Sequence, residues 1–130
     1  MVLDDLYTYL QGAGVGLPMQ KGTIAGEPDD VLAFRETGGF PPQHVLAVGP
    51  GNAVIEEPTI QVLARSMAYD TAEQAIRLVY RLLDGLRNQS INGVDYHFIS
   101  ALQPPFLLER DENDRFVLAF NVHIRRQTVP

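Results

Sequence analysis

The sequence contains no cysteine, and this absence removes several kinds of chemistry at once. Without thiols, the chain has no disulfides, no thiolate nucleophile, no cysteine-ligated zinc and no iron–sulfur cluster. It also lacks the run of about 18 apolar residues that a membrane-spanning helix needs. The N-terminal stretch MVLDDLYTYL carries two aspartates where a signal peptide carries cations. We therefore expect a protein that is made and kept in a cytosol, with no membrane partner.

Positive charge is also scarce in this sequence. Lys and Arg number 10 against 16 Asp and Glu, so the formal net charge is -6. Proteins bind nucleic acid largely by neutralising its phosphates with Lys and Arg, so we expect no tight nucleic-acid binding. With 130 residues, 45% of them apolar, the chain is predicted to form one domain, residues 1–130, with a real hydrophobic core.

Hydrophobic periodicity and turn residues predict two helices and four strands. The first expected elements are a short amphipathic helix over 2–11 and strands over 31–36 and 59–65. A long helix follows, which Asp70 or Thr71 caps and which ends at Leu86. After the Asn92–Gly93 hairpin turn come a strand over 96–102, which is interrupted at Pro104 and Pro105, and a final strand over 116–125. This order favours an α+β fold, in which two helices pack on one face of a mainly antiparallel sheet of about four strands.

Residues 37–58 carry the strongest chain breakers in the sequence. Gly38-Gly39 and Pro41-Pro42 stand near the start of this segment, and Gly49-Pro50-Gly51 forms a second bend. The segment is predicted to be a long loop, and a loop of this length in a compact domain is usually functional or mobile.

Candidate chemical motifs all fail on spacing or context. His44, His97 and His123 show no metal-ligand spacing. The glycines after residue 11 follow a helix rather than a strand, so they are no phosphate loop. The turn Asp111–Asp114 lacks the glycine and the distant glutamate of a calcium loop. We predict no catalytic, cofactor-binding or metal site and no cofactor.

An ordered set of segments resembles the bacteriophage minor capsid and tail-terminator family. These segments are Leu3-Asp4-Asp5-Leu6, then Phe34-Arg35-Glu36-Thr37-Gly38-Gly39 with Pro41-Pro42, then Pro58–Arg65, then Tyr69–Glu73, and finally Leu102–Arg115 leading to Asn121-Val122. The resemblance spans nearly the whole chain, although residues 37–58 are longer than the family's usual link between these strands. It implies a non-enzymatic protein of the virion, placed at the head–tail junction and assembled in the host cytoplasm.

The partners implied by the resemblance are copies of the chain itself in a ring, commonly of six, the tail tube protein and the head–tail connector proteins. Such a ring caps the tail tube, stops its polymerisation and provides the surface for joining to the head, while DNA passes through its lumen. One alternative is a head-completion or stopper protein, which binds on the portal side. Another is a small bacterial enzyme or ligand-binding domain that uses His44, His97 or His123 with scattered carboxylates.

Two groups of residues are the candidate contacts of this assembly. Subunit contacts are predicted on the polar face of the 59–65 strand and in the charged turn before the last strand: Gln61, Arg65, Arg110, Asp111, Asp114 and Arg115. Contacts with the tail tube or connector are predicted in the long loop: Phe40, Pro41, Pro42, Gly49, Pro50 and Gly51.

Overall fold

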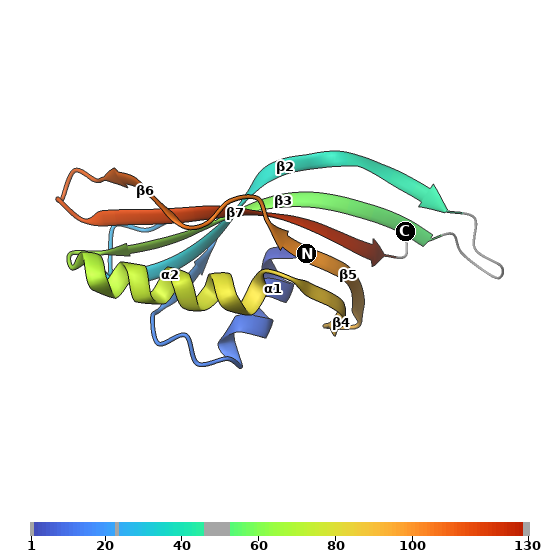
Figure 1. Cartoon of the computed structure of the whole chain (residues 1–130), viewed down its shortest axis with the longest axis horizontal. Helices are drawn as coiled ribbons and strands as arrows, with labels where there is room; N and C mark the ends of the chain where they lie inside the picture. The colour runs from blue at the N-terminus through green and yellow to red at the C-terminus, as the bar shows by residue number, and fades with distance from the viewer. Residues whose placement is uncertain (1, 23, 46–52, 129–130) are drawn as a thin grey trace.

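The structure is a computed structural model that describes residues 2–22, 24–45 and 53–128, and in these residues two helices accompany one seven-stranded curled sheet (Figure 1). The elements are α1 (Val2–Gln11), β1 (Met19–Lys21), β2 (Val31–Val45), β3 (Ala53–Ser66), α2 (Tyr69–Leu83), β4 (Leu86–Ile91), β5 (Val94–Ala101), β6 (Phe106–Arg110) and β7 (Phe116–Thr128). The molecule is elongated, and β2 and β3 extend from one end as a hairpin arm.

The long strand β7 lies at the centre of the sheet. The strand order is β1-β2-β3-β7-β5-β4, and every pairing is antiparallel except the parallel pair β1–β2. One edge of β7 pairs with β3. The other edge pairs with β6 near the start of β7 and with β5 along the rest of it. Pro104 and Pro105 separate the two strands, because proline cannot donate a ladder hydrogen bond. The Gln103 side chain accepts the hydrogen bond of the Asn121 N–H there, at 3.1 Å.

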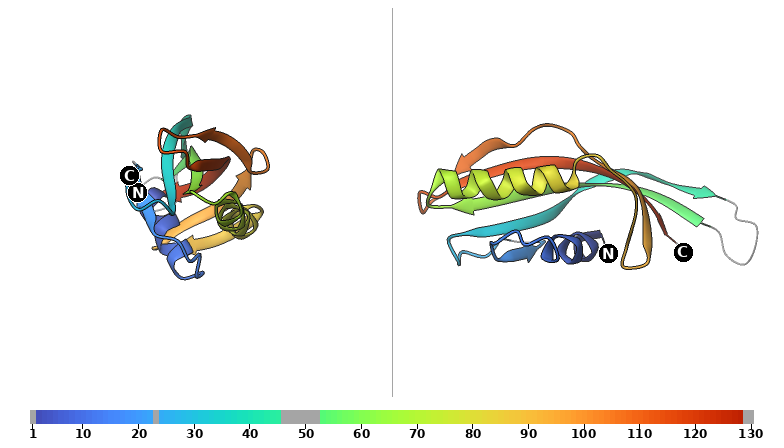
Figure 2. Two further views of the ribbon diagram at one scale, coloured as in Figure 1. Left: turned by 90° about the vertical axis from the view of Figure 1, so that its left-hand side faces the viewer. Right: turned by 60° about the horizontal axis from the view of Figure 1, so that its bottom comes forward.

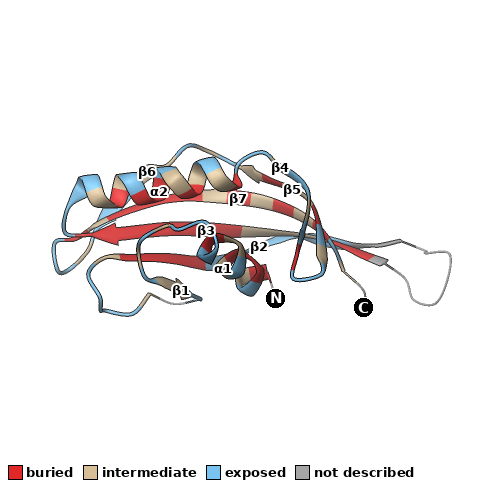
Figure 3. Cartoon of the chain, turned by 90° about the horizontal axis from the view of Figure 1, so that it is seen from below, coloured by how far each residue is buried: buried red, intermediate tan, exposed pale blue. Residues whose placement is uncertain are grey.

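The main core fills the hollow side of the curled sheet. Alternate residues of each central strand point into it, among them Phe34, Ile60 and Phe120, each fully buried. Helix α1 adds its apolar stripe, and α2 covers β3, β7 and β5 (Figures 2 and 3). In the part of the chain that the structure describes, no helix has both the length and the apolar character needed to cross a membrane.

The opposite face of the sheet carries a second, smaller core. Ala33, Leu63, Val117 and Ala119 are buried there and pack against Ile24 and Phe106. The segment 24–30 and strand β6 therefore cover this end of the outer face. The remainder of this face, toward the arm, carries polar and aromatic side chains.

The prediction of a four-stranded sheet with two helices on one face is wrong. The sheet has seven strands in the described residues, and it curls into a half-barrel that is mostly β (Figure 2). The missed strands β1, β4 and β6 are short, and each carries only one or two residues that pack on a core, so no alternating apolar pattern marks them in the sequence. Register shifts in the β2–β3, β5–β7 and β6–β7 pairs add the twist that lets long strands curl.

Where the structure describes the segment 37–58, it forms strands rather than a loop. Strand β2 continues through Gly38-Gly39 and Pro41-Pro42 to Val45, paired with β3 from Ala53. Register shifts between Glu36 and Gly38 and between Phe40 and Gln43 accommodate the breakers. Glycine and proline are compatible with an edge strand at such bulges. Gly49, Pro50 and Gly51 lie outside the described residues.

The predicted helices and hairpin turn are otherwise close to the observed ones. Helix α1 has the predicted bounds, and Asn92 and Gly93 adopt the positive φ angles of 51° and 76° that a type I′ turn requires. Helix α2 begins earlier than predicted, after Ala68, and has no side-chain cap. It also ends earlier, because Gly85 turns the chain with a φ of 86° and Leu86 enters β4.

Candidate assembly surfaces

Two buried arginines fasten the segment 26–30 onto the outer face of the sheet. Arg115 Nη1 donates to the Gly26 carbonyl at 2.6 Å, and Arg65 Nη2 donates to the Pro28 carbonyl at 2.7 Å. Both arginines are buried, with residue exposures of 4% for Arg115 and 5% for Arg65. A guanidinium has five N–H donors in a fixed plane, so it can hold several carbonyls of an irregular segment together. This use of the arginines is structural and internal to the chain.

The turn before β7 completes this network through Asp111. Its carboxylate accepts hydrogen bonds from the Arg115 backbone N–H at 2.9 Å and from Arg115 Nε at 2.7 Å. Partial burial raises the pKa of Asp111, but these hydrogen bonds and the Arg115 charge outweigh it, and the pKa lies below its ordinary value. Burial and the nearby Arg115 cation lower the pKa of Arg65 in turn.

The predicted subunit-contact residues therefore fall into two groups. Gln61 is buried and accepts a hydrogen bond from Arg35 Nε at 2.7 Å, so it joins Arg65 and Arg115 in making contacts inside the chain. Arg110 and Asp114 are exposed and form an ion pair at 3.0 Å. A subunit-contact role for all six residues stays a prediction, and Arg110 and Asp114 are the two whose side chains reach the surface.

The hairpin arm depends on a close approach of β2 and β3 at Gly39. A Cβ at this position would lie 2.7 Å from the Glu57 carbonyl oxygen and 2.9 Å from the Pro58 Cα. Only glycine fits such a gap. The next residue, Phe40, is 57% exposed and packs on the ring of His123, with a centroid separation of 4.9 Å. His123 Nε2 also lies 3.3 Å from Glu57 Oε1.

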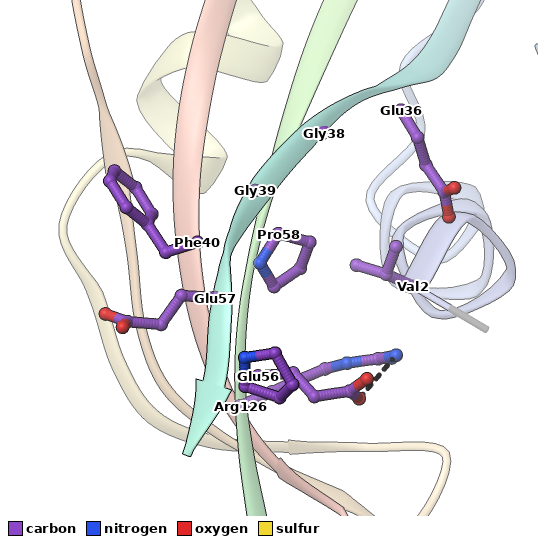
Figure 4. A pocket seen from close by; sticks show the side chains of 10 residues that line it. Val2, Glu36, Gly38, Gly39, Phe40, Glu56, Glu57, Pro58 and Arg126 are labelled. Atoms are coloured by element: carbon purple, nitrogen blue, oxygen red, sulfur yellow. Dashed lines mark ion pairs between the residues drawn. The ribbon is translucent and has the colours of Figure 1, made fainter.

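A shallow hollow of about 360 Å³ lies where the arm leaves the body of the molecule. Val2 of α1 and Glu36 of β2 line it on the helix side, while Phe40 and Glu57 lie on the other side of the β2–β3 ribbon (Figure 4). Glu56 pairs with Arg126 at 3.1 Å on its floor. The hollow is open to solvent and is lined by the carboxylates of Glu36, Glu56 and Glu57.

Strand β6, whose outer edge has no strand partner in the described residues, carries exposed leucines. Leu107 is 49% exposed and Leu108 is 38% exposed, although both lie in a strand. Leu102, just before this strand, is 59% exposed. A strand edge with exposed leucines is a template for pairing with another chain.

A buried polar network that the sequence did not reveal joins α1 to the sheet. The Tyr96 hydroxyl donates to Asp5, and Arg126 Nη1 lies 3.5 Å from the same carboxylate. All three side chains are buried, and burial together with the bond to Asp5 raises the pKa of Tyr96. Asp5 and Tyr96 are 91 residues apart in sequence, so no local pattern could indicate the contact.

The surroundings of His123 are two aromatic rings and one carboxylate. His123 lies between Phe40 and Phe98, and its carboxylate neighbour is Glu57. No group of three or more potential metal ligands occurs in the ranges 2–22, 24–45 and 53–128. The arrangement offers pairing edges and packing surfaces for an assembly.

Comparisons with known proteins identify the family of the chain. A family model described as "Bacteriophage tail terminator protein" matches residues 9–128, so the chain belongs to this family. Among solved structures, a chain of the "Virion of native gene transfer agent (GTA) particle" is similar, with a TM-score of 0.56 and 15% identity over 95% of this chain and 92% of that chain. At that identity the similarity concerns the fold. No curated protein matches.

Proposed function

We propose that this chain forms a ring at the end of a phage tail tube, stops the polymerisation of the tube and provides the surface for joining to the head. The observation that carries the proposal is the tail-terminator family match over residues 9–128. It places the chain among structural proteins of the virion, a role that needs no catalysis or cofactor. Exposed strand edges at both sides of the sheet supply the kind of surface that a cyclic assembly of identical subunits uses.

The arm is the proposed contact with the tail tube or the connector. Phe40, Pro41 and Pro42 are exposed on it, and it extends beyond the helix-covered core (Figure 1). Proline-rich and aromatic surface fits a docking site, because these side chains lose little conformational entropy on binding. DNA would pass through the lumen of the ring, and the net charge of -6 favours a wall that does not grip it.

Purified tail tubes test this proposal. Native mass spectrometry and electron microscopy of tubes mixed with the protein should show a ring of subunits at one tube end, and polymerisation of added tube protein should stop. A protein that stays monomeric in the presence of tubes would refute the ring. If the protein instead binds portal–connector complexes and leaves tube growth unchanged, it is a stopper of the head side.

A further inference from the structure

Several strand edges of the molecule have no strand partner in the described residues, and two of them, on β2 and β6, lie on opposite sides of the sheet. On one side, β1 covers β2 only from Leu32 to Phe34, so β2 is open from Arg35 onward. On the other side, β6 pairs with β7 alone. Two different open edges on one molecule favour head-to-tail contact between copies, which closes into a ring when the rotation permits.

From these edges we propose that β6 of one copy pairs with the stretch Glu36–Phe40 of β2 in the next copy, in antiparallel orientation. In this register Arg110 lies opposite Glu36, and Phe106 lies opposite Phe40. The inference rests on the proposed ring and names the contact that builds it. It assigns Phe40 to the contact between copies and leaves Pro41 and Pro42 for the tube or connector.

The faces of the two strands agree with this register. In an antiparallel pair, residues directly opposite each other lie on the same face of the sheet. Phe106 packs on the outer-face core, and Phe40 packs on His123, which alternates with Ala119 on that same face. Both members of the aromatic pair therefore lie on the outer face.

The charged pair lies on the opposite, helix-bearing face. Glu36 borders the hollow beside Val2 of α1 (Figure 4). The Arg110 guanidinium lies 4.4 Å from the ring centroid of Phe116, which packs against the main core and meets Tyr69 of α2 edge-on. Strand β2 has one register shift within residues 36–40, and β6 has one within residues 106–110. Because both strands contain one such shift over the same length, the aromatic pair and the charged pair can each lie on a single face.

The pairing of each edge with its own copy fits less well when all five residues of the stretch pair. In that register an antiparallel β6–β6 pair sets Phe106 opposite Arg110, and the two side chains lie on different faces. An antiparallel β2–β2 pair sets Glu36 opposite Phe40 with the same mismatch. A parallel β6–β2 pair could also place Arg110 beside Glu36. It would, however, direct Phe106 to Leu32, whose edge β1 already covers.

The leucines of β6 and the glycines of β2 complement each other in the proposed register. Leu108 and Leu107 would lie opposite Gly38 and Gly39, where no side chain of the neighbour competes for space. These leucines are 38% and 49% exposed in the single chain. Covering them against the glycine backbone would remove apolar surface from water, which favours association.

Disulfide cross-linking tests the register, and the absence of native cysteine makes it specific. Copies with Glu36→Cys are mixed with differently tagged copies with Arg110→Cys on tail tubes under mild oxidation. A mixed disulfide dimer is expected, since residues opposite each other lie within bonding reach. The matched control replaces Arg110→Cys with Glu109→Cys, one position away on the other face, and should give little of this dimer.

Charge exchange gives an independent readout with the same pair. Glu36→Arg and Arg110→Glu should each weaken assembly by about twofold to fivefold, and mixing the two variants should restore it, because opposite charges again face each other. Wild-type rings that form on tubes without the 36–110 cross-link and without response to charge exchange would overturn this contact and leave the ring standing. A wild-type protein that forms no ring on tubes would instead overturn the proposed function.

Discussion

Replacing Arg115 with alanine separates an internal role of this side chain from a role between subunits. Arg115 makes two short charge-assisted hydrogen bonds, to Asp111 at 2.7 Å and to the Gly26 carbonyl at 2.6 Å, and its side chain is 5% exposed. Its ion pair with Asp29 at 3.2 Å adds little, because Asp29 is 61% exposed. At about 1.5–3 kcal/mol for each bond to a charged group, Arg115→Ala should lower the free energy of unfolding by about 3–5 kcal/mol.

A loss of this size is easily measured in a domain of 130 residues. At about 4 °C per kcal/mol, the melting temperature should fall by roughly 12–20 °C, and urea unfolding monitored by circular dichroism gives the free energy directly. Arg81→Ala is the matched control, since Arg81 is exposed on α2, and its unfolding free energy should change by less than about 0.5 kcal/mol. If Arg115→Ala melted like the native chain but failed to assemble on tubes, Arg115 would act between subunits and the reasoning would be refuted.

Three further changes test the arm, the buried network and the charged turn. Gly39→Ala should destabilise the chain by about 1–3 kcal/mol, because its Cβ meets the neighbouring backbone, whereas Gly26→Ala has open space; equal melting temperatures would contradict the close approach. Tyr96→Phe should lower the free energy of unfolding by about 1–3 kcal/mol in urea, since it removes the hydroxyl donor to the buried Asp5 carboxylate, which keeps only its contacts with Asn92 and Arg126; a neutral result would remove the network as a stabilising feature. Because the pKa of Asp111 is lowered in the folded state, its carboxylate stabilises the fold at pH values above the ordinary pKa of 3.8, and this stabilisation is lost as the pH falls through the lower folded pKa. Asp111→Asn should flatten this acidic part of the plot of unfolding free energy against pH, and an unchanged plot would contradict the lowered pKa.

The fold was only partly predictable because different forces hold its elements. The long helix, the strands at 31–36 and 59–65 and the final strand bury alternating or helical apolar stripes, and these stripes are visible in the sequence. The short strands β4 and β6 each place only one or two side chains on a core, and their remaining contribution is backbone pairing, which any residue except proline can make. Their side chains carry no pattern, and so the count of about four strands was wrong.

In the hairpin arm, the local sequence preferences predicted a loop where the structure has a strand. Gly38-Gly39 and Pro41-Pro42 are local breakers, and they predicted a loop, but pairing with β3 carries the strand through them. Paired backbone on a long neighbour outweighs the local preferences, and the register shifts absorb the remaining misfit.

The absence of thiols and the scarcity of cations are properties of composition, so no folding could change them. The ordered segments from Leu3 to Val122 were equally sufficient to indicate the tail-terminator family, which the family match confirms. The surroundings of Arg65 and Arg115 were decided only by the tertiary structure, because hydrogen bonds to Gly26 and Pro28 join segments that are distant in sequence. The same is true of the open edges of β2 and β6, since whether a strand has a neighbour depends on the whole sheet.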